Sequence, residues 1–132
     1  MEMNETETDI VRLDIEPEHD LKEELVRFFK EHSAKISVVI NALGLLGKVR
    51  LCLPGTNRLL CLAGPIELLN ASGVIKKENS EVRANVNIMI GKGGKVYAGK
   101  LSSECVAMKP EGVTVFLFMS RRHLFLDPKK LR

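Results

Sequence analysis

The amino-acid sequence predicts an α+β domain in which one or two helices cover a curved, mainly antiparallel β-sheet. Three observations favour this class. One amphipathic helical pattern occurs near the beginning of the chain, about eight short β-branched runs follow it, and polar or glycine-rich turns separate those runs. With 132 residues, 45% of them hydrophobic, the chain has the size and composition of one globular domain.

The first expected elements are a strand and a helix. Residues 10–15 alternate apolar and polar side chains, which predicts a half-buried strand. After a short turn, Asp20 has the character of an N-cap, and Glu23 follows it at the spacing of a capping box. Apolar residues then recur at helical spacing, so we expect an amphipathic helix over residues 21–32.

The rest of the chain is predicted to form strands. Residues 36–40 form a short apolar run typical of a central strand, and residues 41–47 read as a glycine-punctuated connection or bulge. The turn residues 54–57 predict a hairpin between two neighbouring runs. The predicted strands after the helix are 36–40, 49–53, 58–62, 66–75, 82–90, 95–101, 105–109 and 113–119.

Charge divides the chain unevenly. Residues 1–25 hold ten acidic and two basic side chains, whereas the remainder holds seven acidic and eighteen basic ones. We expect an acidic, disordered N-terminus over residues 1–9, a domain over residues 10–120 and a basic C-terminal arm over residues 121–132. No apolar run approaches the ~18 residues of a membrane span. The acidic beginning of the chain is unlike a secretory leader, so a cytoplasmic protein without a membrane partner is expected.

No arrangement of reactive residues predicts catalysis or a cofactor. The glycines of residues 91–95 lack the spacing of a phosphate-binding loop and precede a strand, so a hairpin turn is expected there. The three histidines are scattered along the chain. Cys52, Cys61 and Cys105 show no metal-binding spacing and read as buried thiols, although Cys52 and Cys61 flank a turn and pairing between them stays open. The sequence favours a non-enzymatic role without deciding the point.

The stretch Gly64-Pro65-Ile66-Glu67-Leu68-Leu69-Asn70-Ala71-Ser72-Gly73 resembles the glycine-x-Phe-Glu-Leu-Leu-x-x-Ser-Gly signature of the PPC domain (plants and prokaryotes conserved). Other segments resemble the same family in the same order: residues 13–21, 31–33, 42–44 and 94–99. The resemblance covers about residues 10–120. It implies a PPC-type curved antiparallel sheet with flanking helices, assembled as a trimer.

The resemblance also bears on ligands. Many free-standing prokaryotic relatives carry a His-x-His pair and a third histidine that suggest a metal site, but here these positions hold Asn85, Asn87 and Lys100. Amides are weak zinc ligands and a lysine ammonium is a cation, so we expect the metal site to be lost. Depending on the turn between the two strands, Lys100 opposes either Asn85 or Asn87, and in both registers the three polar groups share one face.

Basic residues at the end of the chain suggest a second kind of contact. In land plants the PPC domain is joined to AT-hook segments that bind DNA, but the AT-hook core is absent here. Unpaired lysine and arginine side chains are what phosphate contact requires. The candidate phosphate contacts are Arg121, Arg122, Lys129 and Lys130.

Three functions remain open at the level of sequence. The first is a non-enzymatic trimeric module that binds other macromolecules, such as DNA in transcriptional regulation or other proteins. The alternative is a small-ligand-binding protein or enzyme that uses Asn85, Asn87 and Lys100, with Glu67 nearby, to hold an anionic or carbonyl-bearing ligand. The third is a scaffold that only assembles with itself. Whether the partners in such an assembly are identical chains is left undecided.

Overall fold

The computed structural model describes residues 8–121, which form seven β-strands and one α-helix. In chain order the elements are β1 (Thr8–Ile15), α1 (Leu21–Glu31), β2 (Ile36–Cys52), β3 (Leu59–Glu78), β4 (Glu81–Lys92), β5 (Lys95–Leu101), β6 (Val106–Ala107) and β7 (Val113–Ser120). All strand pairings are antiparallel. The predicted class, an α+β domain built on a mainly antiparallel sheet, is confirmed.

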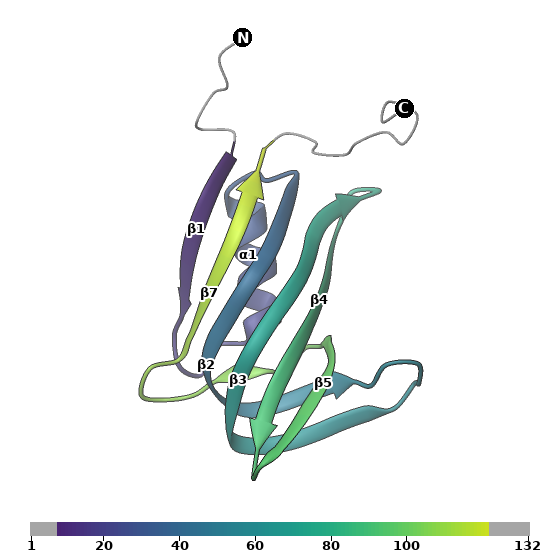
Figure 1. Ribbon diagram of the computed structural model, residues 1–132. Coiled ribbons are helices and arrows are strands. Elements are labelled where there is room, and N and C mark those ends of the chain that lie inside the picture. The colour runs from purple at the N-terminus through teal and green to yellow at the C-terminus, as the bar shows by residue number, and fades with distance from the viewer. Residues whose placement is uncertain (1–7, 122–132) are drawn as a thin grey trace, which may run out of the picture.

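The strands form a single sheet that closes on itself at one end. They lie in the order β1-β7-β2-β3-β4-β5, and the short β6 pairs with β2. β5 pairs with β4 and also with the end of β2, where Leu51 lies opposite Leu101 and Cys52 opposite Lys100. At one end of the strands, β5 therefore bridges β4 and β2, and we call this the closed end of the sheet. At the opposite end, where β1 and the first half of β4 lie, no strand makes such a bridge, and we call this the open end (Figure 1).

The helix α1 begins where the sequence predicts because Asp20 caps it. Asp20 Oδ1 accepts a hydrogen bond from the backbone N–H of Glu23 at 3.0 Å. Leu21, Leu25 and Phe29 recur at helical spacing and are buried. Figure 1 shows α1 behind β1, β7 and β2. We call this side of the sheet the inner face and the opposite side, which no helix of residues 8–121 covers, the outer face.

Alternate residues of the strands point to the inner face and form the core with α1. In β7 the four inner residues are each at most 1% exposed: Val113, Val115, Leu117 and Met119. β4 contributes Val86, Ile88 and Ile90 to the same core. Burial of one such side chain contributes about 1.5–3 kcal/mol. The alternation also sends the intervening residues of each strand to the outer face, where the candidate site lies.

Two strands are longer than the sequence predicts. β2 runs without interruption through the predicted connection 41–47, because a bulge near each end of that stretch absorbs the irregular pairing. The predicted strands 58–62 and 66–75 are likewise both part of β3. The expectation of eight strands after the helix is therefore wrong, and the described residues hold six.

The hairpin turns follow the sequence. Between β2 and β3, the backbone N–H of Leu53 donates to the carbonyl of Arg58 at 3.0 Å. Between β4 and β5, Gly93 and Gly94 form a two-residue turn with φ values of +58° and +80°, a region that favours glycine. The glycine cluster is therefore a turn, as expected, and its position fixes the register of β5 on β4.

The three cysteines form no disulfide. The register sets Cys52 opposite Leu59 and Cys61 opposite Arg50, so the two cysteines near the hairpin do not face one another directly. Cys105 is buried as expected, and this desolvation raises the pKa of its thiol. Cys52 is only partly buried and Cys61 is exposed, so the expectation of buried thiols is wrong for Cys61. Among residues 8–121, no helix is both long enough and apolar enough to cross a membrane.

Candidate functional site

The structure places Asn85, Asn87 and Lys100 on the outer face, near the open end of β4. The turn at Gly93-Gly94 pairs Lys100 with Asn87, which decides between the two predicted registers. Asn85 lies two residues along β4 on the same face, opposite Val74 of β3. All three polar side chains are exposed. They therefore form an exposed polar surface.

One edge of β4 has no strand partner in this region. β5 pairs with β4 only along residues 87–92, since the chain then turns at the end of β5 to pair with β2. β3 covers the other edge of β4 along its whole length. Within the described part of the chain, the edge of residues 81–86 is therefore open, and we call these residues the free edge of β4.

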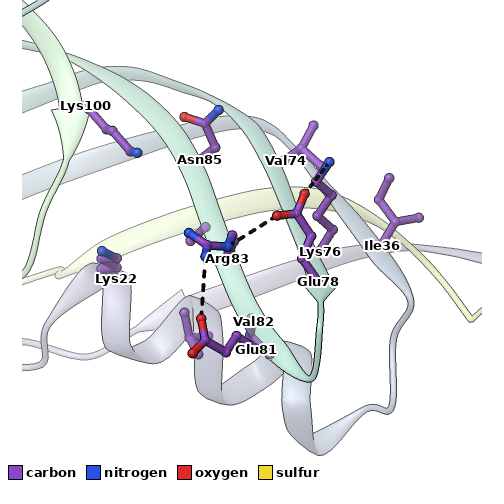
Figure 2. Close-up of a pocket in the computed structure, with 12 residues that line it drawn as sticks. Lys22, Ile36, Val74, Lys76, Glu78, Glu81, Val82, Arg83, Asn85 and Lys100 are labelled. Atoms are coloured by element: carbon purple, nitrogen blue, oxygen red, sulfur yellow. Dashed lines mark ion pairs between the residues drawn. The ribbon is translucent and has the colours of Figure 1, made fainter.

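A hollow of about 740 Å³ follows the free edge of β4 on both faces of the sheet. α1 contributes Lys22 and Val26 on the inner side, and β5 contributes Lys100 (Figure 2). The other lining residues come from β2, β3 and β4: Ile36, Val74, Lys76, Glu78, Glu81, Val82, Arg83, Ala84 and Asn85. The volume is within the range of ligand-binding sites, roughly 300–1,000 Å³.

The charges around this hollow are partly compensated. Glu78 pairs with Lys76 at 2.9 Å and with Arg83 at 3.2 Å, and Glu81 lies 3.6 Å from Arg83. The hydrogen bond and charge of Lys76 hold the pKa of Glu78 below its usual range. Within residues 8–121, neither Lys22 nor Lys100 forms an ion pair, and no hydrogen bond to the side chain of Asn85 is found.

Four cations and two carboxylates therefore line the hollow, which leaves a net charge of +2 before any ligand binds. A ligand that brings negative charge to Lys22 and Lys100 would not have to break an ion pair of either lysine within residues 8–121. The sequence reasoning found Lys100 and Asn85 but missed Lys22 and Arg83. Lys22 lies on the helix, 78 positions before Lys100, and only the packing of α1 against β4 brings the two side chains to one hollow.

Two other predicted site residues lie apart from this hollow. Asn87 is on the same face but is not part of the hollow's lining. Glu67 lies opposite Gly91 and lines a separate hollow together with Lys92 and Lys95. The structure thus joins Asn85 and Lys100 and separates Glu67 from them. The use of all four residues by one small ligand stays a prediction.

Arg121 is the only predicted phosphate contact within the described residues. Its Nη1 lies 3.1 Å from Asp9 Oδ2, and its Nε donates to the carbonyl of His32 at 3.1 Å. These contacts tie the end of β7 to β1 and to the end of α1. Arg122, Lys129 and Lys130 lie outside the described residues.

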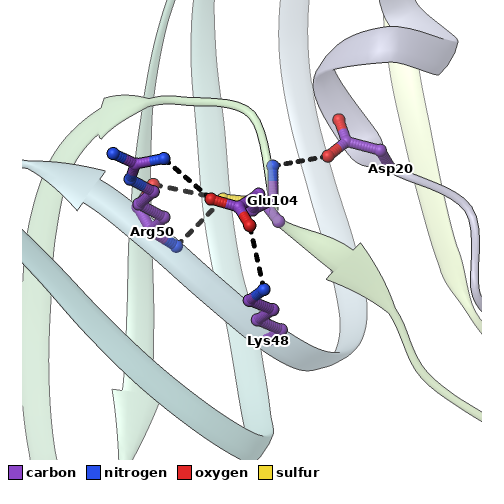
Figure 3. A network of polar contacts seen from close by, with 5 residues as sticks. Asp20, Lys48, Arg50 and Glu104 are labelled. Carbon is purple, nitrogen blue, oxygen red and sulfur yellow. Dashed lines mark hydrogen bonds and ion pairs between the residues drawn. The ribbon is translucent and has the colours of Figure 1, made fainter.

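A second polar cluster has a structural role (Figure 3). The carboxylate of Glu104 pairs with Lys48 at 3.0 Å and with Arg50 at 2.7 Å. The hydrogen bonds from Lys48 and then Arg50 hold the pKa of Glu104 below its usual range. Asp20 Oδ2 accepts a hydrogen bond from the backbone N–H of Glu104 at 2.6 Å. The cluster therefore joins the beginning of α1 to β2, and its charges are compensated by one another.

The histidines within the described residues also have local partners. His19 Nδ1 lies 2.8 Å from Glu24 Oε1, and His32 stacks on Phe28 at the end of α1. His123 lies outside the described residues. No group of three or more His, Cys, Asp or Glu side chains placed to hold a metal ion occurs in residues 8–121.

The outer face also carries an apolar row that crosses four strands. The register sets Ile10 beside Phe118, Phe118 beside Val38, and Val38 beside Val74. Ile10 is 78% exposed, and the other three are partly exposed. Asn85, opposite Val74, continues this row to the free edge of β4. Other exposed apolar residues of the outer face are Ile40, Leu43, Met89 and Phe116.

The glycines that begin and end the signature stretch lie where backbones approach closely. A Cβ on Gly64 would come within 2.6 Å of the carbonyl oxygen of Leu46. At Gly73, where φ is +153°, a Cβ would come within 2.2 Å of the carbonyl oxygen of Asn85. Both glycines are thus required by the packing of β3 against its neighbours, which gives the signature a structural meaning.

Comparison with known proteins agrees with this fold. The family model of the Plants and Prokaryotes Conserved (PCC) domain, also abbreviated PPC, matches residues 3–118. No protein with a curated description matches the chain.

Solved structures from three organisms are similar to this chain. A hypothetical protein from Salmonella enterica has a TM-score of 0.74 and 14% identity, over 89% of this chain and 80% of that one. A supposed DNA-binding protein from Bacteroides thetaiotaomicron has a TM-score of 0.71 and 23% identity, with coverages of 89% and 80%. A PPC protein from Pyrococcus horikoshii has a TM-score of 0.69 and 20% identity, with coverages of 88% and 80%. At these identities the likeness shows the fold.

Proposed function

Because this chain belongs to the Plants and Prokaryotes Conserved domain family, we propose that it is a non-enzymatic module that assembles with copies of itself and binds other macromolecules. The apolar row on the outer face is the observation that favours assembly most directly. Large exposed apolar surfaces on soluble domains mark sites of association. The trimer that the family resemblance implies would cover this row and present every basic segment three times.

Assembly is tested by placing a charge in the apolar row. Phe118→Asp or Val38→Asp would put a carboxylate in the proposed interface, where burial of an unpaired charge opposes association. We expect light scattering coupled to size exclusion to show a trimer for the unmodified protein and a monomer for these variants. Val96→Asp is the matched control, because Val96 is 61% exposed on β5, away from the row. A monomeric unmodified protein would refute the proposal.

DNA is the partner that we propose for the assembled module. The supposed DNA-binding protein from Bacteroides thetaiotaomicron has the same fold, and Arg122, Lys129 and Lys130 of the present chain follow β7 in the sequence. Phosphate contacts need no particular base sequence, so generic duplex DNA is a suitable probe. Arg121 is less suited to this role, because Asp9 and the carbonyl of His32 already engage its guanidinium.

A gel-shift series at increasing salt tests the DNA contact. We expect retardation at low salt that weakens as salt rises, because phosphate contacts release counterions. The triple variant Arg122→Gln/Lys129→Gln/Lys130→Gln should bind more weakly and lower the salt slope by about three for each C-terminal segment that contacts DNA. Lys95→Gln, which removes one exposed lysine on β5, serves as the control. Absence of retardation at low salt with folded protein would remove DNA from the proposal.

A further inference from the structure

We propose that the free edge of β4, residues 81–86, binds an extended acidic peptide as an additional strand of the sheet. This inference rests on the open edge, the hollow beside it and the charges around it. It requires neither assembly nor DNA binding, but it does require that a neighbouring copy in the proposed assembly leaves the free edge of β4 uncovered.

The backbone of β4 provides the first part of the site. β3 pairs with one edge of residues 81–86, and no strand of the described chain pairs with the other. Unpaired N–H and C=O groups along a strand edge are a template for a further strand. The open stretch is about 20 Å long at roughly 3.3 Å per residue, which suits a peptide of about six extended residues.

The hollow provides room for the side chains of such a peptide. Successive residues of a strand point to opposite faces of the sheet, so the peptide needs space on both. On the inner side the hollow is lined by Val26, Val82 and Ala84, and on the outer side by Val74. A strand placed along the edge would therefore find apolar surface on each face.

The charges select an acidic peptide. Lys22 lies on the inner side of the free edge, and Lys100 lies where β5 leaves β4, with its side chain directed toward the hollow (Figure 2). Neither ammonium has a carboxylate partner within residues 8–121. Because the two cations lie on opposite faces of the sheet, carboxylates of a bound peptide would reach them from adjacent positions or from positions three apart. Charge-assisted hydrogen bonds are stronger than neutral ones. A basic peptide would meet a net positive charge and be repelled.

The experiment uses the full chain and a synthetic acidic peptide. The probe is acetyl-Glu-Glu-Val-Val-Glu-Glu-amide, which presents carboxylates on both faces of an added strand. Binding is followed by calorimetry and by the backbone amide signals of the labelled protein in NMR spectra. We expect the largest signal changes at residues 81–86. A peptide with Lys in place of Glu should not bind. The acidic peptide with N-methyl groups on alternate residues should bind at least about tenfold more weakly, because it lacks strand donors.

Variants distinguish this site from general charge attraction. Lys22→Gln/Lys100→Gln should weaken the acidic peptide about tenfold or more. Lys95→Gln/Lys30→Gln removes the same charge from exposed lysines outside the hollow and should leave the affinity unchanged. Equal loss in both double variants would overturn the proposal, as would equal binding of the N-methylated peptide. Signal changes confined to other strands would also overturn it. The absence of any signal change, because a neighbouring copy covers the edge, would overturn it as well.

Discussion

At the scale of single residues, a few polar side chains decide how the pieces of the fold meet. Asp20 uses one carboxylate oxygen to cap α1 and the other to accept the backbone N–H of Glu104. Glu104 in turn holds Lys48 and Arg50 of β2. The cap could be predicted from the sequence, since its spacing is local. The link from residue 20 to residue 104 could not, because it depends on how distant segments pack.

The pH dependence of stability tests the role of Glu104. Its pKa is lowered in the folded protein by hydrogen bonds from Lys48 and Arg50, so its contribution is present above the unfolded pKa and is lost as pH falls through the folded pKa. Glu104→Gln should therefore be less stable than the unmodified protein at about pH 7, and the difference should shrink toward about pH 3. Urea unfolding at both pH values measures this gap.

Glu111→Gln is the control for that measurement, because Glu111 is exposed and forms no ion pair within residues 8–121. A gap for Glu104→Gln that stays constant across the acidic range would contradict the assigned role of its ion pairs.

At the scale of elements, the two long strands β2 and β3 organise the molecule. Each strand continues through a stretch where the sequence has glycines that predict the end of a strand. In the structure these glycines lie at bulges or at close approaches between backbones. A glycine in a strand pattern can mark a turn, a bulge or a close approach, and local sequence does not choose among them. This is why the predicted strands were too short and too many.

Gly73 provides the test at this scale. Because φ is +153° and a Cβ would meet the carbonyl oxygen of Asn85 at 2.2 Å, Gly73→Ala should destabilise the protein by about 2 kcal/mol or more. At Gly47 the nearest atom to an added Cβ is the side chain of Met108 at 3.5 Å, so Gly47→Ala should stay within about 0.5 kcal/mol. Denaturant unfolding compares the two, and equal small effects would contradict the close approach at Gly73.

At the scale of the whole molecule, the sheet has a closed end and an open end. At the closed end, β5 joins β4 to β2, so residues 88–91 of β4 are paired on both sides. At the open end, residues 81–86 of the same strand are paired only with β3. The polar surface of Asn85 and Lys100 and the apolar row both reach this open end, which makes it the part of the molecule best placed for contacts with partners.

Amide hydrogen exchange should show this difference within one strand. Amides of residues 88–91 should exchange slowly, whereas those of residues 81–86 that point away from β3 should exchange rapidly, because only water bonds to them. NMR detection at single-residue resolution separates the two groups. Equally slow exchange in both groups would mean that the edge is covered, and would contradict the free edge of β4.

The sequence by itself determined the α+β class, the helix that Asp20 caps, the glycine turn before β5 and the family, because each depends on local spacing or on one continuous signature. Tertiary structure decided what those signals could not. The tertiary structure determined the register that pairs Lys100 with Asn87, and it placed Lys22 in the hollow that Lys100 also lines. It also left one edge of β4 open. These features depend on contacts between residues far apart in the chain, which no local pattern encodes.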